Sequence, residues 1–279
     1  MDKAIISVAT TGGVTSRQQT PHVPITEEEI AEQAIASWKE GASIVHIHVR
    51  DEEQLATCDP ERYARVQELI RAEPGCDIII NMSTGGRAGR LTEDERIAPV
   101  RVRPEIASYD CGSINFGEGV FVNSPTFLDQ LAREMQEYGV KPEIECFDTG
   151  MIENAKRIIA QGLIEPPYWF QFVLGVRGGA PATLQHLNLM INELPENSRW
   201  SVCAIGRHQL PMNAIAIALG GHPRTGLEDN IYYAYRVLAE SNQQLVARVA
   251  RLCKEMERPI ATPAETREML GLPPFQQVA

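Results

Sequence analysis

The sequence lacks the paired cysteines that define small metal-bound or disulfide-bonded folds. Its 279 residues include six cysteines, and no two of them form a C-x-x-C pair. They are scattered along the chain at positions 58, 76, 111, 146, 203 and 253. This pattern argues against a zinc ribbon, a dithiol redox motif and a disulfide scaffold. Isolated cysteines are typical of reduced, buried thiols, so we expect a cytoplasmic protein.

Long apolar segments and an excess of positive charge are also missing. No stretch approaches the roughly 20 apolar residues of a membrane span. The first residues, MDKAIISVATTGG, lack the length and cleavage pattern of a secretion signal. The net charge of −11 argues against nucleic acid or an anionic membrane as the main partner, because both attract basic surfaces. The net charge does not exclude small anionic ligands, since a local arginine cluster can create a positive site on a negatively charged protein. The glycine motifs of P-loop and dinucleotide-binding proteins are absent as well.

Short runs of apolar, β-branched residues alternate with longer segments of helical periodicity along the whole chain. Several runs are apolar throughout, which is typical of parallel strands buried on both faces. Eight βα units favour a closed (β/α)8 TIM barrel over an open doubly wound sheet, although the pattern by itself does not distinguish the two strand orders. The last of the eight strands has the weakest strand pattern, because it contains Pro223 and Gly226. The candidate strands are 4–9, 43–49, 77–82, 105–109, 143–147, 169–174, 200–205 and 223–227.

Several helices between these strands begin with recognisable N-terminal capping residues. Thr26 with Glu29 forms a capping box, and the helices that follow Asp59 and Ser124 each begin with a proline. The predicted helices are 27–40, 60–73, 125–138 and a C-terminal helix opened by Thr262-Pro263 with Glu265. We expect one barrel domain over residues 1–279, with a helical extension from about residue 258. We also expect a homo-oligomer, either a dimer or a tetramer.

Two histidines lie two residues apart on the second predicted strand, in the segment SIVHIHVRD. Because strand side chains alternate between faces, His46 and His48 share one face while Val45, Ile47 and Val49 share the other. The apolar face should contact the helices, which leaves both imidazoles inside the barrel near the strand's C-terminal end. At a rise of about 3.3 Å per residue, the pair is about 6.6 Å apart along the strand and can converge on one ion. Two core histidines bonded to nearby polar groups are the alternative explanation.

An acidic segment after the last predicted strand supplies candidate partners for these histidines. The sequence GGHPRTGLEDN spans residues 220–230 and joins that strand to the last long helix. A catalytic zinc usually adds a carboxylate to its histidines and keeps one position open, so Glu228 is the candidate third ligand. Asp229 is then the candidate general base, and Arg224 modulates it or holds an anionic substrate. Taken alone, Glu228 and Asp229 are better explained as the acidic first turn of a helix.

Other polar residues lie on or just after the strands. Loop 83–87, STGGR, has glycines and hydroxyls that suit a carboxylate or a phosphate, although a plain tight turn uses the same residues. Glu143 and Glu145 alternate along one strand and share a face, where a ligand or a structural ion pair would explain them. The remaining histidines, at positions 22, 186, 208 and 222, lack a partner at metal-ligand spacing.

Taken together, these segments resemble the β-keto acid cleavage enzymes, the family that includes 3-keto-5-aminohexanoate cleavage enzyme. The resemblance covers nearly the whole chain and is far more specific than the H-x-H motif alone. It rests on TPHVPITEEEIAEQA, GASIVHIHVRD, NMSTGG, PEIASYDCGSINFG, KPEIECFDTGM, LGGHPRTGLEDN and the C-terminal IATPAETREMLGL.

The resemblance implies a (β/α)8-barrel enzyme in which a β-keto acid reacts with acetyl-CoA to give acetoacetate and a new acyl-CoA. It also implies one Zn²⁺ per chain, which would polarise the keto group and stabilise the enolate. The family's zinc ligands fall on His46, His48 and Glu228. Its catalytic residues fall on Asp229, Arg224 and Glu143, and its substrate-binding residues fall on Ser83, Gly86 and Ser108.

One position departs from the family pattern. Members that act on an amino-bearing keto acid carry a glutamate at the end of the first strand, where this sequence has Val14 after Gly12 and Gly13. A cationic amine would lose its counter-charge beside Val14, which favours a keto acid with an uncharged side chain. A one-residue shift around the two glycines, or an acid from another loop such as Glu118, would restore the charge.

Two other functions fit part of the pattern. A metal-dependent amidohydrolase-like barrel also begins its site with H-x-H. It does so on the first strand and adds histidines on later strands, whereas no later predicted strand here carries one. A non-catalytic barrel that binds acyl-CoA or another metabolite would need no general base, so Asp229 beside Glu228 argues against it.

Overall fold

Eight parallel strands pair in chain order around a closed circle, each with its neighbours in the sequence. The computed structural model describes residues 2–86 and 90–276. Its barrel strands are β1 (Ser7–Ala9), β2 (Ile44–Ile47), β5 (Ile79–Met82), β6 (Ile106–Asp110), β9 (Lys141–Cys146), β10 (Tyr168–Leu174), β11 (Ser198–Ala204) and β12 (His222–Thr225). The circle closes where Ser7 pairs with Arg224. Each strand overlaps a predicted one, so the predicted TIM barrel is confirmed.

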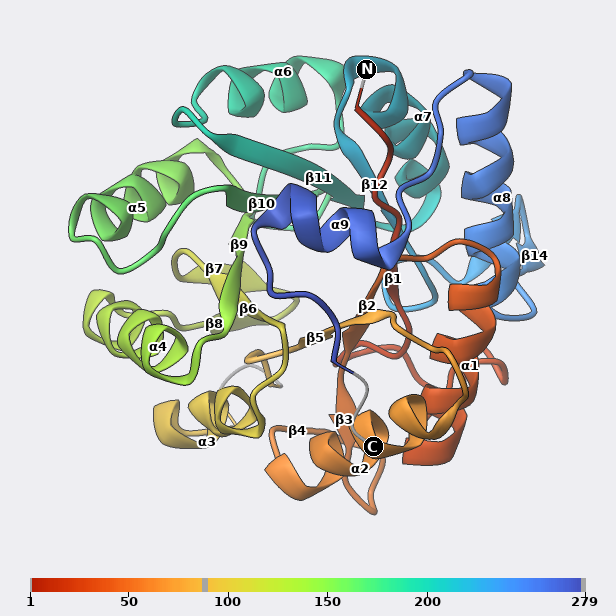
Figure 1. Cartoon of the computed structure of the whole chain (residues 1–279), viewed down its shortest axis with the longest axis horizontal. Helices are drawn as coiled ribbons and strands as arrows, with labels where there is room; N and C mark the ends of the chain where they lie inside the picture. The colour runs from red at the N-terminus through yellow and green to blue at the C-terminus, as the bar shows by residue number, and fades with distance from the viewer. Residues whose placement is uncertain (1, 87–89, 277–279) are drawn as a thin grey trace.

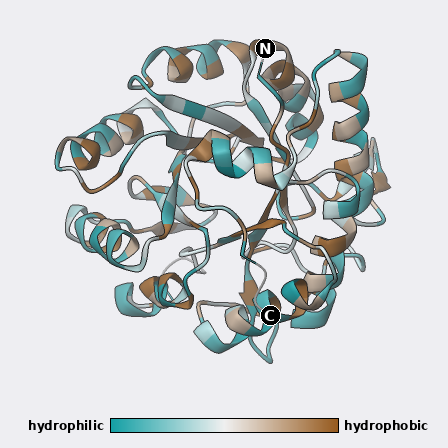
Figure 2. Cartoon of the chain, viewed as in Figure 1, coloured by the Kyte–Doolittle hydropathy of each residue, from teal (hydrophilic) through white to brown (hydrophobic). Residues whose placement is uncertain are grey.

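Helices surround the barrel and cover its outer surface (Figure 1). They are α1 (Glu27–Lys39), α2 (Pro60–Ala72), α3 (Glu93–Ile97), α4 (Pro125–Tyr138), α5 (Thr149–Ala160), α6 (Leu184–Asn192), α7 (Gln209–Leu219) and α8 (Asn242–Glu255), with 3-10 turns at Ala98–Val102 and Gly206–His208. The predicted caps form: Thr26, Asp59 and Ser124 each accept a backbone hydrogen bond from the first turn of their helix. The helices carry hydrophobic and hydrophilic residues in alternation (Figure 2), as expected of elements with one buried face.

Three short hairpins, which the sequence pattern did not indicate, lie in the loops that follow β2, β6 and β12. They are β3–β4 (Val49–Arg50 and Ala56–Thr57), β7–β8 (Ile114–Phe116 and Gly119–Phe121) and β13–β14 (Tyr232–Ala234 and Val237–Leu238). The predicted strand 43–49 is therefore divided at His48, because Val49 pairs with Thr57 of its own loop and leaves the barrel. The last strand ends at Thr225, before the predicted Leu227, since Gly226 has a φ of +135° that turns the chain.

The N-terminal end of the barrel is filled by apolar side chains and covered by the C-terminal segment. Leu270 of α9 (Pro263–Leu270) packs with a layer of inward side chains from successive strands. That layer consists of Ile5, Ile44, Ile79, Ile106 and Trp169. The guanidinium of Arg267, which is buried, bonds to Glu105 and to the carbonyl of Asp77. Accordingly α9 lies across the middle of the barrel in Figure 1.

The C-terminal half of the barrel interior is polar instead. Side chains at alternate positions, His46, Asn81, Ser108, Glu143 and Arg224, are all at most 3% exposed. Their strand neighbours on the opposite face, such as Val45 and Ile80, pack against the helices. Polar groups buried in this way need partners, and barrel enzymes place their active sites at this end. None of the helices in the described ranges has the length and apolar character that crossing a bilayer requires.

Candidate active site

His46, His48 and Glu228 converge at the C-terminal end of the barrel. The distance from Nε2 of His46 to Oε1 of Glu228 is 3.7 Å, and that from Nε2 of His48 to the same oxygen is 3.6 Å. The closed barrel causes this convergence, because only β1 separates β2 from β12. The backbone N–H of Glu228 donates to the carbonyl of Ala9 at the end of β1. Gly12 lies against Glu228, and a Cβ built there would be 2.6 Å from its Cγ.

This donor set fits a divalent cation such as zinc. Bonds of about 2.0–2.2 Å place two ligands of a tetrahedral ion about 3.4 Å apart, close to the distances observed. Within the described residues, Oε2 of Glu228 is buried and has no hydrogen-bond partner. Burial holds the pKa of His46 well below its usual value, so the ring is neutral and able to bind a metal. Although burial alone would raise it, the pKa of Glu228 is lowered chiefly by His48 and Arg224.

A second group of possible ligands, His46 with Glu143 and Glu145, lies deeper in the barrel. Arg224 lies near both carboxylates of this group. Nη1 of Arg224 is 3.8 Å from Oε1 of Glu143 and 3.7 Å from Oε1 of Glu145. The same guanidinium is 2.7 Å from Glu228, but both oxygens of Glu143 already accept hydrogen bonds, whereas Oε2 of Glu228 has no partner in the described residues. The geometry therefore favours the first group, which also contains the residues that the sequence analysis selected.

Arg224 and Asp229 form a buried bidentate pair beside the first group. Nε and Nη2 of Arg224 each donate to a carboxylate oxygen of Asp229 at 3.1 Å, and Nη2 also donates to Glu228 at 2.7 Å. Burial raises the pKa of Asp229, and the arginine opposes that shift. Against the effect of burial, Asp229 and the neighbouring acids raise the pKa of Arg224, which stays charged. A carboxylate held in this way is more basic than one in water.

Glu143 is fixed by two donors that the sequence analysis did not identify. Nδ2 of Asn81 donates to Oε1 at 2.7 Å, and Nε1 of Trp169 donates to Oε2 at 2.9 Å. The same Oε1 is 3.7 Å from Nδ1 of His46. Burial raises the pKa of Glu143. Asn81 lies inside the predicted strand 77–82, where a polar residue between Ile80 and Met82 was a usable signal.

The predicted substrate-binding residues lie in two different settings. Ser83 and Ser108 are buried, and their hydroxyls brace loop 83–86 by bonding to Gly85 and to the backbone N–H of Thr84. Gly86 has no room for a side chain, since a Cβ there would be 2.2 Å from Leu91. Arg87 of the same motif lies outside the described residues. Val14 is 66% exposed, on the loop that follows β1.

Two carboxyl groups without a hydrogen-bond donor in the described residues face the same end of the barrel. Asp110 of β6 and Glu145 of β9 are register partners on adjacent strands. They are only 6% and 8% exposed. Burial and their mutual repulsion raise the pKa of Glu145 well above its usual value, and burial raises that of Asp110. The sequence analysis identified Glu145 but missed Asp110, although its spacing of two from Ser108 was a usable signal.

The other histidines have ordinary surroundings. His222 begins β12, one residue before the predicted strand, so one later strand does carry a histidine, contrary to the sequence analysis. Its Nδ1 accepts the backbone N–H of Ile5 at 3.0 Å and its ring contacts that of Trp169, at the opposite end of the barrel from the site. In the described ranges, neither it nor His22, His186 or His208 belongs to a group that could hold a metal.

Comparison with known proteins agrees with this geometry. A family model described as beta-keto acid cleavage enzyme matches residues 3–272. The chain belongs to this family. It is therefore an enzyme, and both the amidohydrolase-like barrel and the non-catalytic binding barrel are set aside. Family members cleave a carbon–carbon bond by acyl transfer, and so does this enzyme.

Curated relatives match along almost their whole length. A 3-keto-5-aminohexanoate cleavage enzyme of Fusobacterium nucleatum is 47% identical over 98% of this chain and 99% of its own. A 3-oxoadipate:acetyl-CoA acetyltransferase of Cupriavidus necator is 42% identical over 98% and 96%. A 3-dehydrocarnitine:acetyl-CoA trimethylamine transferase of Rhizobium meliloti is 38% identical over 97% of each chain. Among solved structures, apo ObcA shares the fold with a TM-score of 0.79 and 24% identity, over 90% of this chain and 66% of that one.

The neighbouring carboxyl groups of Asp110 and Glu145 lead to a prediction about stability. The pKa of Glu145 in the folded protein lies above its ordinary value of 4.5, so ionisation lowers stability as the pH rises from about 4.5 towards the raised pKa. Glu145→Gln should remove this decline and raise the free energy of unfolding at neutral pH by about 1–3 kcal/mol. Denaturant unfolding of the chelator-treated protein at several pH values measures it. The exposed Glu137→Gln serves as the control. A destabilised Glu145→Gln variant at neutral pH would show that the carboxylate is compensated.

Proposed function

We propose that this enzyme is a zinc-dependent β-keto acid:acetyl-CoA acyltransferase that releases acetoacetate and a new acyl-CoA. The observation that carries the proposal is the meeting of His46, His48 and Glu228 beside the Arg224–Asp229 pair. The names of the relatives support acetyl-CoA as the co-substrate, since the enzymes from Cupriavidus necator and Rhizobium meliloti both carry it in their names. A zinc ion bound by the three ligands would polarise the keto group and stabilise the negative charge of an enolate.

Asp229 is assigned the role of general base. It would take a proton from the carbon between the keto and carboxylate groups of the substrate. Its burial supports the role, because a carboxylate with a raised pKa accepts a proton more readily. Arg224 would orient Asp229 through the two hydrogen bonds and keep it ionised before the proton arrives.

The remaining steps conserve the atoms of both substrates. The enolate carbon forms a bond to the thioester carbonyl of acetyl-CoA, and the CoA thiolate leaves. The thiolate then attacks the original keto carbon, the bond between that carbon and the enolate carbon breaks, and the new acyl-CoA is released. Asp229 returns its proton to the departing carbon, which yields acetoacetate. No net oxidation occurs, and no other reactant is needed.

The other site residues are assigned supporting roles. Glu143, fixed by Asn81 and Trp169, would keep His46 oriented and face the substrate. Ser83, Gly86 and Ser108 would hold the substrate carboxylate, and Val14 would border the entrance. The cytoplasmic location and the homo-oligomeric state, a dimer or a tetramer, stay predictions.

The metal assignment predicts the zinc content of single variants. His46→Ala and His48→Ala should each lose most of the bound zinc, since a site with one protein ligand fewer binds far more weakly. Elemental analysis of the purified, folded proteins measures this. His186→Ala, which removes a partly exposed histidine outside the ligand group, should keep the wild-type content. Full zinc content in both the His46 and His48 variants would place the metal elsewhere.

The base assignment predicts a loss of rate without a loss of metal. Asp229→Asn keeps the shape of the side chain but removes its basicity, so turnover should fall by about 10²–10⁴ while zinc content is retained. A steady-state assay of acetoacetate formation measures it. Turnover close to wild type would move the base to another carboxylate, with Glu143 as the first candidate.

Substrate choice provides a third test. With Val14 in place of an acid, a substrate ammonium lacks a counter-charge there, so kcat/KM should favour a neutral keto acid over an aminated one of equal length. Because Val14 is 66% exposed, water screens a charge at this position, so a counter-charge there is worth about 0.2–1 kcal/mol, up to about fivefold in kcat/KM. Val14→Glu should then raise turnover of the amine. If the wild-type enzyme already has the higher kcat/KM with the aminated substrate, the counter-charge comes from another residue. Asp110 and Glu145, whose carboxyl groups lie side by side on adjacent strands, are then the first candidates.

A further inference from the structure

We propose that the loops after β10 and β11 bind the nucleotide end of CoA, through a basic track made of Arg207, His208 and Arg177. This inference rests on the proposed use of acetyl-CoA and assigns the residues that recognise its phosphates. The adenine ring would occupy the cavity at the far end of the track, next to α6. The ligand chemistry is a 3′-phosphorylated adenosine diphosphate joined to an uncharged pantetheine arm.

The charge of these two loops is opposite to that of the chain. The sequence has 37 acidic and 26 basic residues. Loops 175–183 and 205–208 nevertheless contain two arginines and a histidine and no acid. Arg177 and Arg207 are exposed, and neither pairs with a carboxylate in the described part of the chain. By contrast, the loop after β2 carries Asp51, Glu52 and Glu53. A polyanionic ligand at this end of the barrel therefore meets attraction on the β10–β11 side and repulsion on the other.

The track starts at the candidate catalytic residues. The backbone N–H of Gly206 donates to the carbonyl of Asp229 at 2.8 Å, so Arg207 lies one residue from a contact with the proposed base. The two loops also touch each other. The N–H of Ile205 donates to the carbonyl of Leu174 at 3.1 Å, and a Cβ built on Gly175 would be 3.7 Å from the ring of His208. Acetyl-CoA with its thioester beside Asp229 would thus extend its phosphates along Arg207 and Arg177.

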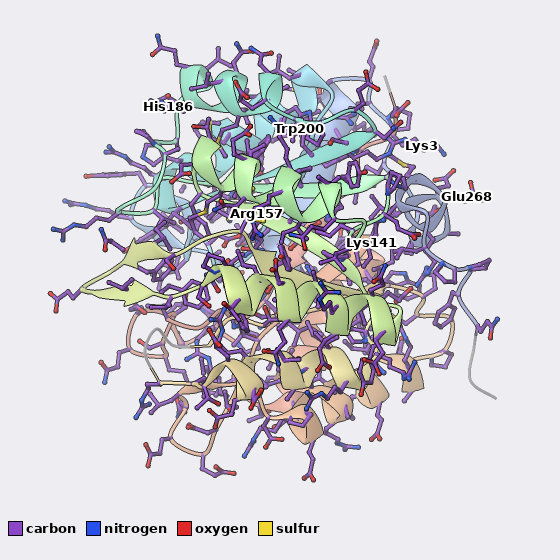
Figure 3. The ribbon with its side chains drawn as sticks, turned by 90° about the vertical axis from the view of Figure 1, so that its left-hand side faces the viewer. Lys3, Lys141, Arg157, His186, Trp200 and Glu268 are labelled. Carbon is purple, nitrogen blue, oxygen red and sulfur yellow. The ribbon has the colours of Figure 1, made fainter. Side chains whose placement is uncertain are left out.

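A cavity of about 260 Å³ lies at the other end of the track. Gly178, which follows Arg177, forms part of its wall together with Pro181, His186 and Leu189. Leu189 is 50% exposed and offers an apolar surface, and the His186 ring offers a stacking partner for a purine. Asp148, also in the wall, is engaged as the cap of α5, where it accepts the N–H of Met151 at 3.0 Å. Figure 3 shows His186 on the side of the projecting β7–β8 hairpin, opposite to Lys3 and Glu268.

Packing fixes the loop that carries Arg177. A Cβ on Gly178 would be 2.4 Å from the carbonyl oxygen of Asn115 on the β7–β8 hairpin, and Gly178 has a φ of +104°. The N–H of Gly175 donates to the carbonyl of Ala180 at 2.9 Å, and the N–H of Ala180 donates to the carbonyl of Phe147. A fixed loop loses little entropy on binding. The neighbouring loop with Arg207 follows β11, the seventh barrel strand, and phosphates in barrel enzymes often bind at the loops after the seventh and eighth strands.

The test compares two acyl donors that differ only in the nucleotide. In the double variant Arg177→Gln/Arg207→Gln, the KM for acetyl-CoA should rise about tenfold or more, since each substitution removes a charge-assisted contact to phosphate. The KM for acetyl-pantetheine, which has no nucleotide, should stay within about twofold of wild type, as should the KM for the keto acid. Arg133→Gln is the matched control, since Arg133 of α4 is exposed and has no carboxylate partner among the residues that the structure describes. Equal changes for both donors, or none for either, would overturn the proposal.

Direct titration with CoA separates this inference from the proposed function. We expect the double variant to bind CoA about tenfold or more weakly than the wild type, with a reduced dependence of the Kd on salt. A wild type that neither binds CoA nor turns over acetyl-CoA would contradict the proposed function itself. If the wild type binds CoA and turns over acetyl-CoA but the double variant has the same Kd for CoA, only the basic track is contradicted.

Discussion

The cost of burying negative charge governs this site. Five carboxyl groups lie inside the C-terminal half of the barrel, on Asp110, Glu143, Glu145, Glu228 and Asp229. Arg224 is within 4 Å of four of them. One guanidinium does not balance that charge in a medium of low dielectric constant. A divalent cation on His46, His48 and Glu228 would add the missing positive charge where the ligand atoms already converge. The buried acids and the proposed metal are therefore two parts of one electrostatic arrangement.

The barrel can tolerate this loss of stability because its two ends have different interiors. At the N-terminal end, Leu270 and the isoleucines of successive strands fill the interior and exclude water. At the other end, the same alternation of side chains directs polar groups inward. Closure between β1 and β12 then brings a loop near residue 228 next to a strand near residue 46. The apolar half stabilises the fold, so that the polar half can hold groups which lower stability but which the reaction needs.

Much of this was predictable from the sequence, because it depends on local rules. Alternation along a strand placed His46 and His48 together, and hydroxyl caps such as Thr26 marked the helix starts. The short hairpins were missed, since two- or three-residue strands leave no periodicity to detect. The pairing of Asp110 with Glu145 also escaped, because it follows from the register of adjacent strands, which sequence spacing does not contain. Likewise, only tertiary structure placed Val14 in an exposed position.

The central claim is that the acetyl group of acetyl-CoA becomes part of acetoacetate while the keto acid supplies the new acyl-CoA. Acetyl-CoA labelled with ¹³C at the carbonyl carbon tests this most directly, with products followed by NMR. The account predicts label at the keto carbon of acetoacetate and none in the new acyl-CoA. Label recovered as free acetate would mean thioester hydrolysis, and label retained in the acyl-CoA product would mean that the enolate does not attack acetyl-CoA. Either result would contradict the mechanism.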